Sequence, residues 1–222
     1  MADFQCPSCG AAVTVKNAAS LYVVCSYCST TSVRKDMNLD EIGKAAVLKE
    51  DGTPIMLQTQ GRYNGKNFEV IGRIQLQFDA GFWNEWHLDY GGKSAWLGET
   101  NGIYVFTEKT ELDEKLKTLK YEDFFLGRPC HIKGNTFFAK DIQDGICVSG
   151  EGELPFPFQN AYRAPVIDLV DRNNKFATLD FSEEEPILFM GDFCEFKDLS
   201  LKNLRDIYEW EKPRVKQSEP IK

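Results

Sequence analysis

A chain of 222 residues is long enough for a small module and one domain with a substantial hydrophobic core. Its hydrophobic fraction of 42%, with 13% aromatic residues, is that of a folded protein and argues against disorder over most of its length. The 34 acidic residues exceed the 26 basic ones, and the net charge of -8 disfavours general binding to phosphate backbones or anionic lipid. We see no signal peptide and no apolar stretch near the roughly 20 residues that span a bilayer, so we expect a soluble, cytoplasmic protein.

Two CxxC pairs, Cys6-Pro-Ser-Cys9 and Cys25-Ser-Tyr-Cys28, stand near the N-terminus at a spacing typical of a four-cysteine zinc site. Each pair turns two thiolates toward one ion, and two pairs leave no open position for a substrate. We therefore predict a zinc ribbon over residues 1–35 that binds one structural Zn²⁺. Two disulfides or a redox-active CxxC pair are the alternatives, which the expected reducing compartment and the lack of a βαβ setting disfavour.

Zinc ribbons often bind nucleic acid, so that function stays an alternative. Within residues 1–35 the basic residues are Lys16, Arg34 and Lys35, against Asp3. Four thiolates also outweigh the charge of the ion by two, which leaves a weak electrostatic footprint for nucleic acid. The ribbon is better explained as a protein-docking or folding module.

Residues 36–53 connect the ribbon to a second domain. Leu39, Ile42 and Ala46 recur at helical spacing, and Asp51-Gly52 before Pro54 can end a helix. We expect a linker or a short helix here.

From residue 54 the pattern changes to strands. Asn64-Gly65 predicts one hairpin, and Gly91-Gly92 predicts a second, in which His87 lies opposite Trp96. Alternation assigns one face of the second hairpin to the core. That face holds Trp86, Leu88, Tyr90, Ala95 and Leu97.

The opposite face of this hairpin holds Trp83, Glu85, His87 and Trp96, with Asp89 beside them. Large aromatic side chains are costly to leave in water, so we expect cover from a protein partner, or else from the C-terminal helix or the ribbon. Glu85, His87 and Asp89 could alternatively form the acid–base group of a hydrolase-like enzyme. Alternating polar residues are usual on a solvated strand face, so we assign no catalytic residue.

Three further cysteines, Cys130, Cys147 and Cys194, raise the question of a second metal site beside His131. They lack ligand spacing, and buried unpaired cysteines behave as small hydrophobic residues. We predict no second metal site.

The segment from Leu88 to Leu97 matches the segment from Val170 to Leu179 without gaps, and Asn173-Asn174 takes the place of Gly91-Gly92. Asparagine is the next best residue for left-handed turn geometry. We infer a diverged duplication of a β unit, with equivalent turns in both copies.

The copies would lie near residues 61–106 and 127–181. Two such halves predict a mainly β domain over residues 54–212, closed as an antiparallel β-barrel or β-sandwich-like fold. A C-terminal helix should complete it, with a mobile tail over 213–222. Residues at helical spacing in that helix are Leu201, Leu204, Ile207 and Tyr208.

Several short segments also carry a resemblance: FEVIGRIQ, WNEWHLDYGGKSAWLGE, GEGELP and FATLDFSEEEP. On these segments the chain resembles the bacterial family filed as Domain of Unknown Function 4178, over about Pro54 to Leu199. Members of that family can carry a similar zinc ribbon in front. Tyrosine is more usual there than His87, which weakens a catalytic role for the histidine. The resemblance brings no established activity and no catalytic residues.

The resemblance also implies that genes of this family lie beside genes for membrane-stress and membrane-scaffold proteins. Such a position indicates an accessory or adaptor role. The sequence therefore predicts a non-enzymatic, zinc-binding adaptor with an unidentified protein partner, for which the resemblance implies an association with a membrane. A nucleic-acid-binding ribbon protein and a hydrolase-like enzyme are the alternatives.

Overall fold

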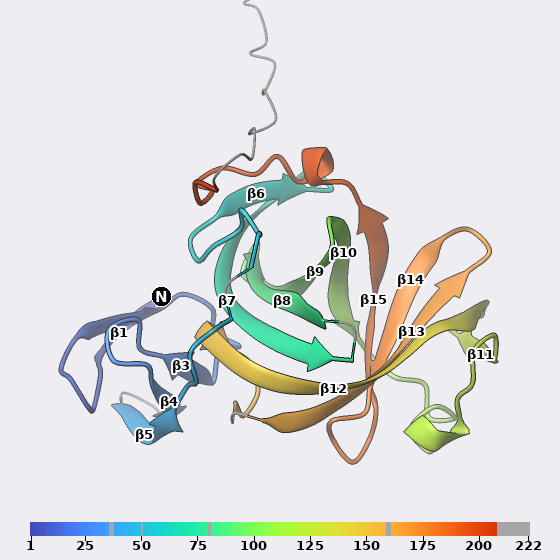
Figure 1. Ribbon diagram of the computed structural model, residues 1–222, viewed down its shortest axis with the longest axis horizontal. Helices are drawn as coiled ribbons and strands as arrows, with labels where there is room; N and C mark the ends of the chain where they lie inside the picture. The colour runs from blue at the N-terminus through green and yellow to red at the C-terminus, as the bar shows by residue number, and fades with distance from the viewer. Residues whose placement is uncertain (36–37, 50, 80, 159–160, 208–222) are drawn as a thin grey trace, which may run out of the picture.

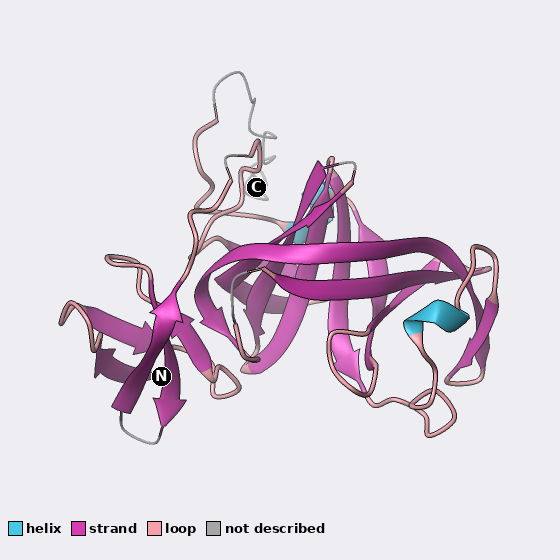
Figure 2. Ribbon diagram, turned by 60° about the horizontal axis from the view of Figure 1, so that its bottom comes forward, coloured by secondary structure: helices cyan, strands magenta, loops and turns pink. Residues whose placement is uncertain are grey.

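The computed structural model describes residues 1–35, 38–49, 51–79, 81–158 and 161–207. Strands account for almost all regular structure in these segments, and helix is limited to two short 3₁₀ turns (Figure 1, Figure 2). None of the described helices is long and apolar enough to cross a membrane. The mainly β fold is therefore confirmed, and the tail expected over 213–222 lies outside the described residues.

The strands follow one another along the chain. The N-terminal strands are β1 (Ala2–Gln5), β2 (Ala12–Val15), β3 (Tyr22–Val24), β4 (Thr30–Lys35) and β5 (Asn38–Lys44). Next come β6 (Gln60–Tyr63), β7 (Lys66–Phe78), β8 (Gly81–Tyr90), β9 (Lys93–Thr100) and β10 (Ile103–Thr110). The last strands are β11 (Pro129–Ile132), β12 (Asn135–Leu154), β13 (Tyr162–Asp171), β14 (Lys175–Asp180) and β15 (Ile187–Cys194). The 3₁₀ turns are η1 (Tyr121–Asp123) and η2 (Phe196–Leu199).

The large sheet closes on itself. Its 13 strands are β3 to β15, whereas β1 and β2 pair separately. A pairing between β7 and β12 joins two distant parts of the sheet, so that β7-β8-β9-β10-β15-β14-β13-β12 form a closed antiparallel ring. β3, β4 and β5 continue from β12 into the N-terminal module (Figure 1).

Two runs of strands have the same order within this domain. β6 to β10 and β11 to β15 are both antiparallel meanders, and the Gly91-Gly92 and Asn173-Asn174 turns both join the third strand to the fourth. The registers differ by one residue, because Leu88 pairs with Ala95 whereas Val170 pairs with Phe176. A duplicated unit predicts such a shared order, and the duplication itself stays a prediction.

The β8–β9 hairpin has the register and the core face that the sequence predicts. Gly91 and Gly92 turn the chain with positive φ angles, and His87 lies opposite Trp96. The predicted core face is buried against the segments around Ile55 and Leu199. Its buried members are Trp86, Leu88, Tyr90, Ala95 and Leu97. A second core around Ile167 and Leu169 occupies the corresponding part of the other half.

The pairing of β7 with β12 depends on glycines where the two backbones meet. A Cβ atom at Gly72 would lie 1.9 Å from the carbonyl oxygen of Glu153, and one at Gly152 would lie 2.3 Å from that of Ile71. Gly152 also has a φ of +70°, which side chains disfavour. The segment GEGELP thus has a structural role in closing the ring.

The connector over residues 36–53 contains a strand where a helix was one of two expectations. β5 pairs with β4 from Asn38 to Lys44, and its Leu39 is buried with Cys6 and Val13 in the ribbon core. Helical spacing of a few apolar residues was misleading here, because pairing with a neighbouring strand supplies the backbone hydrogen bonds instead.

The prediction of a C-terminal helix is wrong for the described residues up to 207. Only η2 is helical, and its last residue Leu199 is fully buried under the first core. Ser200 and Asn203 have positive φ angles of 49° and 56°, which end helical geometry, and Lys202 bridges to Gln60. Tyr208 of the expected helix lies outside the described residues.

Replacing Gly72 by alanine should lower the free energy of unfolding by at least about 2 kcal/mol, because the added Cβ would enter the backbone of β12. The matched control is Gly52→Ala, where a Cβ meets nothing within 4 Å. Urea unfolding measures both. Equal stability of the two variants would contradict the close approach of β7 and β12.

Candidate metal centre and inner cavity

The four predicted ligand cysteines come together in space. The Sγ atoms of Cys6, Cys9, Cys25 and Cys28 all lie within 4.8 Å of one another. The Cys6–Cys28 pair is 3.6 Å apart and the Cys9–Cys25 pair is 3.8 Å apart. Zinc bound to four thiolates at about 2.3 Å places sulfurs about 3.8 Å apart in a tetrahedron. The donor set therefore fits one tetrahedral metal ion, and not disulfides, whose sulfurs are about 2 Å apart.

The two CxxC turns share one backbone geometry. The N–H of Gly10 donates to the carbonyl of Cys6, and the N–H of Ser29 donates to the carbonyl of Cys25, both at 2.9 Å. Gly10, the residue after the first pair, has the expected positive φ of +74°. Ser29, the residue after the second pair, has a φ of +58°. This repeated geometry directs both pairs of thiols toward one point.

Hydrogen bonds favour the thiolate form of Cys28. The hydroxyl and the backbone N–H of Thr30 lower the pKa of Cys28 to about 6. Thiolate is the form that binds a metal ion, so the protein itself promotes ligation at this position.

One buried carboxylate fixes the ribbon to the β domain. Glu153 accepts the backbone N–H groups of Lys16 at 2.7 Å and Asn17 at 3.1 Å. The side chain of Asn17 donates to Asp89 at 2.8 Å, and Lys16 forms an ion pair with Glu69. The ribbon is thereby held in a defined orientation against β7, β8 and β12.

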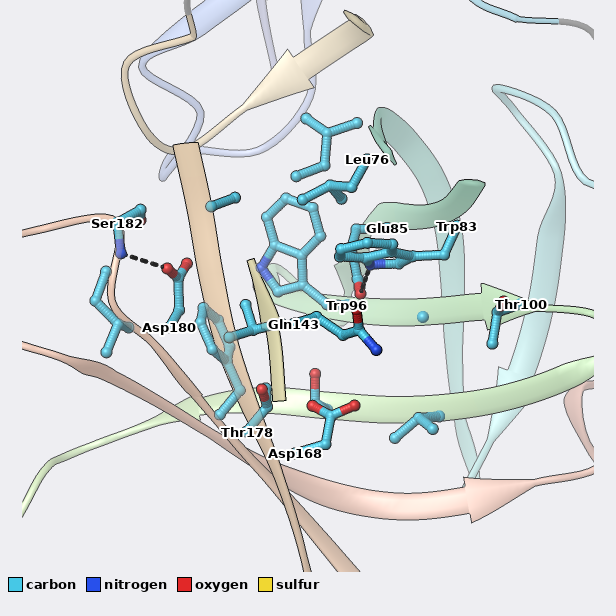
Figure 3. Close-up of a pocket in the computed structure, with 18 of the residues that line it drawn as sticks. Leu76, Trp83, Glu85, Trp96, Thr100, Gln143, Asp168, Thr178, Asp180 and Ser182 are labelled. Carbon is cyan, nitrogen blue, oxygen red and sulfur yellow. Dashed lines mark hydrogen bonds between the residues drawn. The ribbon is translucent and has the colours of Figure 1, made fainter. Parts of the chain in front are cut away.

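The ring of strands surrounds a cavity of about 460 Å³ that opens to solvent near the exposed Asp141, Ser182 and Glu183. Every strand of the ring contributes to the lining, so the cavity lies inside the ring. Apolar side chains form much of the wall, and carboxyl, amide and hydroxyl groups interrupt it (Figure 3). The aromatic lining includes Trp83, Trp96, Phe156, Tyr162, Phe176 and Phe189.

The face that was expected to dock a protein points into the ring. Trp83 and Glu85 line the cavity, Trp96 is only 6% exposed and stacks on Phe156, and His87 is fully buried. Strands β12, β13 and β15 lie across the cavity from the two tryptophans. Closure of the ring turns this face inward, so these four residues form an inner wall and not an outer surface, and protein docking at them stays a prediction.

Glu85 is the central polar group on this inner face. The indole N–H of Trp83 donates to its Oε1 at 3.0 Å (Figure 3). Burial raises the pKa of Glu85 to about 8, and the nearby charge of Asp168 adds to the shift. Gly98 on β9 leaves room for the carboxyl, since a Cβ there would lie 3.3 Å from Oε1.

His87 is held neutral between two partners. Its Nδ1 lies 2.8 Å from the carbonyl oxygen of Glu153, which can only accept, so Nδ1 carries the proton. Nε2 accepts from the hydroxyl of Ser94 at 2.7 Å. Burial lowers the pKa of His87 to about 4. Both ring nitrogens are occupied, and the imidazole serves the junction of β8 with β12.

The acid–base group considered from the sequence does not assemble. Glu85 faces the cavity, His87 contacts the backbone of β12, and Asp89 accepts from Asn17 of the ribbon. Side chains at i and i+2 share a strand face, but this face spans three different environments. Hydrogen-bond reach between acid and base is therefore missing.

Two further carboxyl groups in the cavity were not singled out from the sequence. Burial raises the pKa of Asp168 to about 6, although the hydroxyl of Thr178 donates to it. Burial also raises the pKa of Asp180, which accepts from the N–H of Ser182 at 2.8 Å (Figure 3). The available signal was an aspartate inside the apolar run VIDLV, at an alternating position with Val166.

The remaining cysteines lie in separate parts of the domain. Cys130 belongs to the second core, Cys147 lies beside the cavity wall, and Cys194 packs against the first core. Burial raises the pKa of each thiol. Among the described residues, the only cluster with metal-ligand geometry is the four-cysteine group of the ribbon.

Fold and site together define a mainly β protein with a four-cysteine ribbon fixed to a closed ring of strands. A family model described as "Domain of unknown function (DUF4178)" matches residues 56–195, and the chain belongs to this family. The match confirms the resemblance noted in the sequence and covers the ring but not the ribbon. No curated protein and no solved structure matches the chain.

Zinc should be present at about one ion per chain in the purified protein and absent after Cys25→Ser, since three thiolates bind far more weakly than four. Cys130→Ser is the matched control, because Cys130 is buried in a different core. Elemental analysis of both variants and the wild type tests this. A stoichiometric zinc content in Cys25→Ser would exclude the assigned ligand set.

The wild type should lose stability relative to Glu85→Gln as the pH rises from 4.5 to about 8. The folded-state pKa is raised, so this contribution is fully present below the unfolded value and is lost as pH rises through the folded one. We expect a difference on the order of 2 kcal/mol, because water in the cavity reduces the full effect. Titrating groups that do not interact with Glu85, such as His87, are common to both proteins and cancel, whereas the interaction with Asp168 is part of the measured difference.

Chemical unfolding at several pH values measures this difference, with the exposed Glu195→Gln as control. A stability difference that stays constant across the range would show that Glu85 is solvated like a surface carboxylate.

Proposed function

We propose that the chain is a non-enzymatic, zinc-stabilised adaptor whose β domain binds a ligand inside its ring of strands. The cavity is the observation that carries this proposal. Its volume of about 460 Å³ falls in the range of small-molecule sites, roughly 300–1,000 Å³. Its mixture of aromatic walls and a few directed polar groups is also typical of such sites.

In this proposal the ribbon binds one structural Zn²⁺. Cys6, Cys9, Cys25 and Cys28 supply a complete tetrahedral donor set, which leaves no position for a substrate. The ion would cross-link two turns that have little core of their own. The carboxylate of Glu153 accepts from the N–H groups of Lys16 and Asn17 and so attaches the ordered ribbon to the β domain.

The separation of Glu85, His87 and Asp89 supports a role without catalysis. A hydrolase-like activity remains the second candidate, because Glu85 and Asp168 share the cavity and burial raises the pKa of each by a different amount, to about 8 and about 6. Carboxyl pairs with separated pKa values can divide acid and base roles. Turnover of a cavity ligand that is lost in Glu85→Gln, with binding retained, would favour this candidate.

Nucleic-acid binding receives less support. The three basic side chains of residues 1–35 all have partners within the protein: Lys16 pairs with Glu69, Lys35 pairs with Asp40, and Arg34 donates to the carbonyl of Ala18. Few cations of the ribbon therefore remain for phosphate groups.

A protein partner is part of the adaptor proposal. The ribbon offers Tyr27, which is 80% exposed in the second CxxC turn and is the kind of aromatic residue that dominates binding hot spots. A membrane-stress or membrane-scaffold setting for this partner rests on the family resemblance alone.

Filling the cavity should abolish ligand binding. Val166 lines the cavity from β13, so Val166→Trp would occupy its space, whereas Ile146→Trp places the same ring on an exposed part of β12. Thermal shift with small neutral, anionic and cationic compounds should identify at least one that stabilises the wild type and Ile146→Trp but not Val166→Trp. If no compound of any charge stabilises the wild type, the cavity is not a ligand site.

A further inference from the structure

We propose that the ligand of the inner cavity is an organic cation that carries an alkylammonium group. This inference rests on the proposed function, since it assumes that the cavity binds a ligand. It adds the chemical class of that ligand, and four features of the cavity lead to it.

The first feature is the sign of the charge around the cavity. Carboxyl side chains come from β8, β9, β12, β13, β14 and the loop after β14, and the described lining contains no lysine, arginine or histidine. The acidic members are Glu85, Glu99, Asp141, Asp168, Asp180 and Glu183. Glu99 is already satisfied by Thr53, Trp86 and Tyr104, which leaves the carboxyls of the opposite wall and Glu85 to face a ligand.

The second feature is incomplete hydrogen bonding at Glu85. Its Oε1 accepts from Trp83, whereas Oε2 has no hydrogen-bond partner among the described residues and is open to the cavity. Figure 3 shows the carboxyl groups of Glu85 and Asp168 directed into the space between the two walls. A bound ammonium group would donate to this oxygen and supply a positive charge between the two carboxyls.

The third feature is the aromatic wall beside these carboxyls. Trp83 and Trp96 stand on the same wall as Glu85, and Phe156 and Phe189 complete their surroundings. Indole faces attract ammonium groups through their quadrupole, and the attraction grows when the site is shielded from water. A carboxylate next to indole rings is thus suited to an organic ammonium ion.

The fourth feature separates an organic cation from a metal ion. Hard cations such as Ca²⁺ require 6–8 oxygen ligands at short range, roughly 2.3–2.6 Å. The described cavity carboxyls do not form a metal-type cluster, and apolar groups such as Leu76, Val166 and Ile187 also line the cavity. An alkyl chain can contact these apolar groups while its ammonium end lies between Glu85 and Asp168.

Three ligands of similar shape and different charge test the inference: butylammonium, 1-pentanol and pentanoate. Calorimetry or tryptophan fluorescence should show binding of butylammonium to the full-length wild type, at least 10-fold tighter than 1-pentanol or pentanoate. The affinity for butylammonium should fall at least 10-fold in Glu85→Gln and in Asp168→Asn. Glu195→Gln, an exposed acidic residue outside the cavity, should bind like the wild type.

The outcomes separate a wrong ligand class from a wrong proposal that the cavity binds a ligand. If 1-pentanol or pentanoate binds as tightly as butylammonium and Val166→Trp abolishes this, the cavity binds ligands but the cationic class is wrong. Butylammonium binding that persists in both carboxyl variants would also overturn the class, and so would a lack of butylammonium binding by the wild type. Melting temperatures show whether each variant folds. If one carboxyl variant fails to fold, the other still tests the inference.

Discussion

The close approach of β7 and β12 at Gly72 and Gly152 is the constraint on which the rest of the structure depends. Two backbones can meet there only because neither residue has a Cβ atom. The pairing closes the ring, and the closed ring turns the second face of the β8–β9 hairpin inward. The same stretch of β12 pairs with β3, so the ribbon is attached where the ring closes. The backbone of Glu153 at this point also fixes the tautomer of His87.

Closure of the ring has an electrostatic consequence. Glu85 and Asp168 come from different halves of the domain, and burial raises the pKa of both. Elsewhere in the domain, the buried Glu99 accepts from Thr53, Trp86 and Tyr104, and the buried Arg73 pairs with Asp51. The described lining of the cavity offers its carboxyls no cation, and this supports the proposal of a cationic ligand.

The sequence predicts those features that depend on local chemistry. The CxxC spacing identified all four clustered cysteines, and Gly91-Gly92 with strict alternation gave the register of the β8–β9 hairpin and its core face. The glycines of the turn and the thiol pairs act over a few residues, so their signals are readable in one chain.

Features that depend on distant pairing were missed. Alternation shows that Trp83 and Trp96 share a face, but it cannot show that β12, β13 and β15 lie opposite them. Helical spacing failed near Leu39, where β4 supplies a strand partner, and near Leu199, which anchors a 3₁₀ turn in the core. Asp168 was missed for the same reason, because its role depends on the residues of distant strands that lie opposite it.

Amide hydrogen exchange in β12 tests the closure of the ring most directly. Ser149, Gly150 and Glu151 pair with β7, and no other strand pairing is described for them. The structure predicts that amide protons here which bond to β7 exchange only through global unfolding, as slowly as those of the β8–β9 hairpin. Rapid exchange of all three amides in an otherwise protected β12 would show that the ring is open, and a cavity inside the ring would then be wrong.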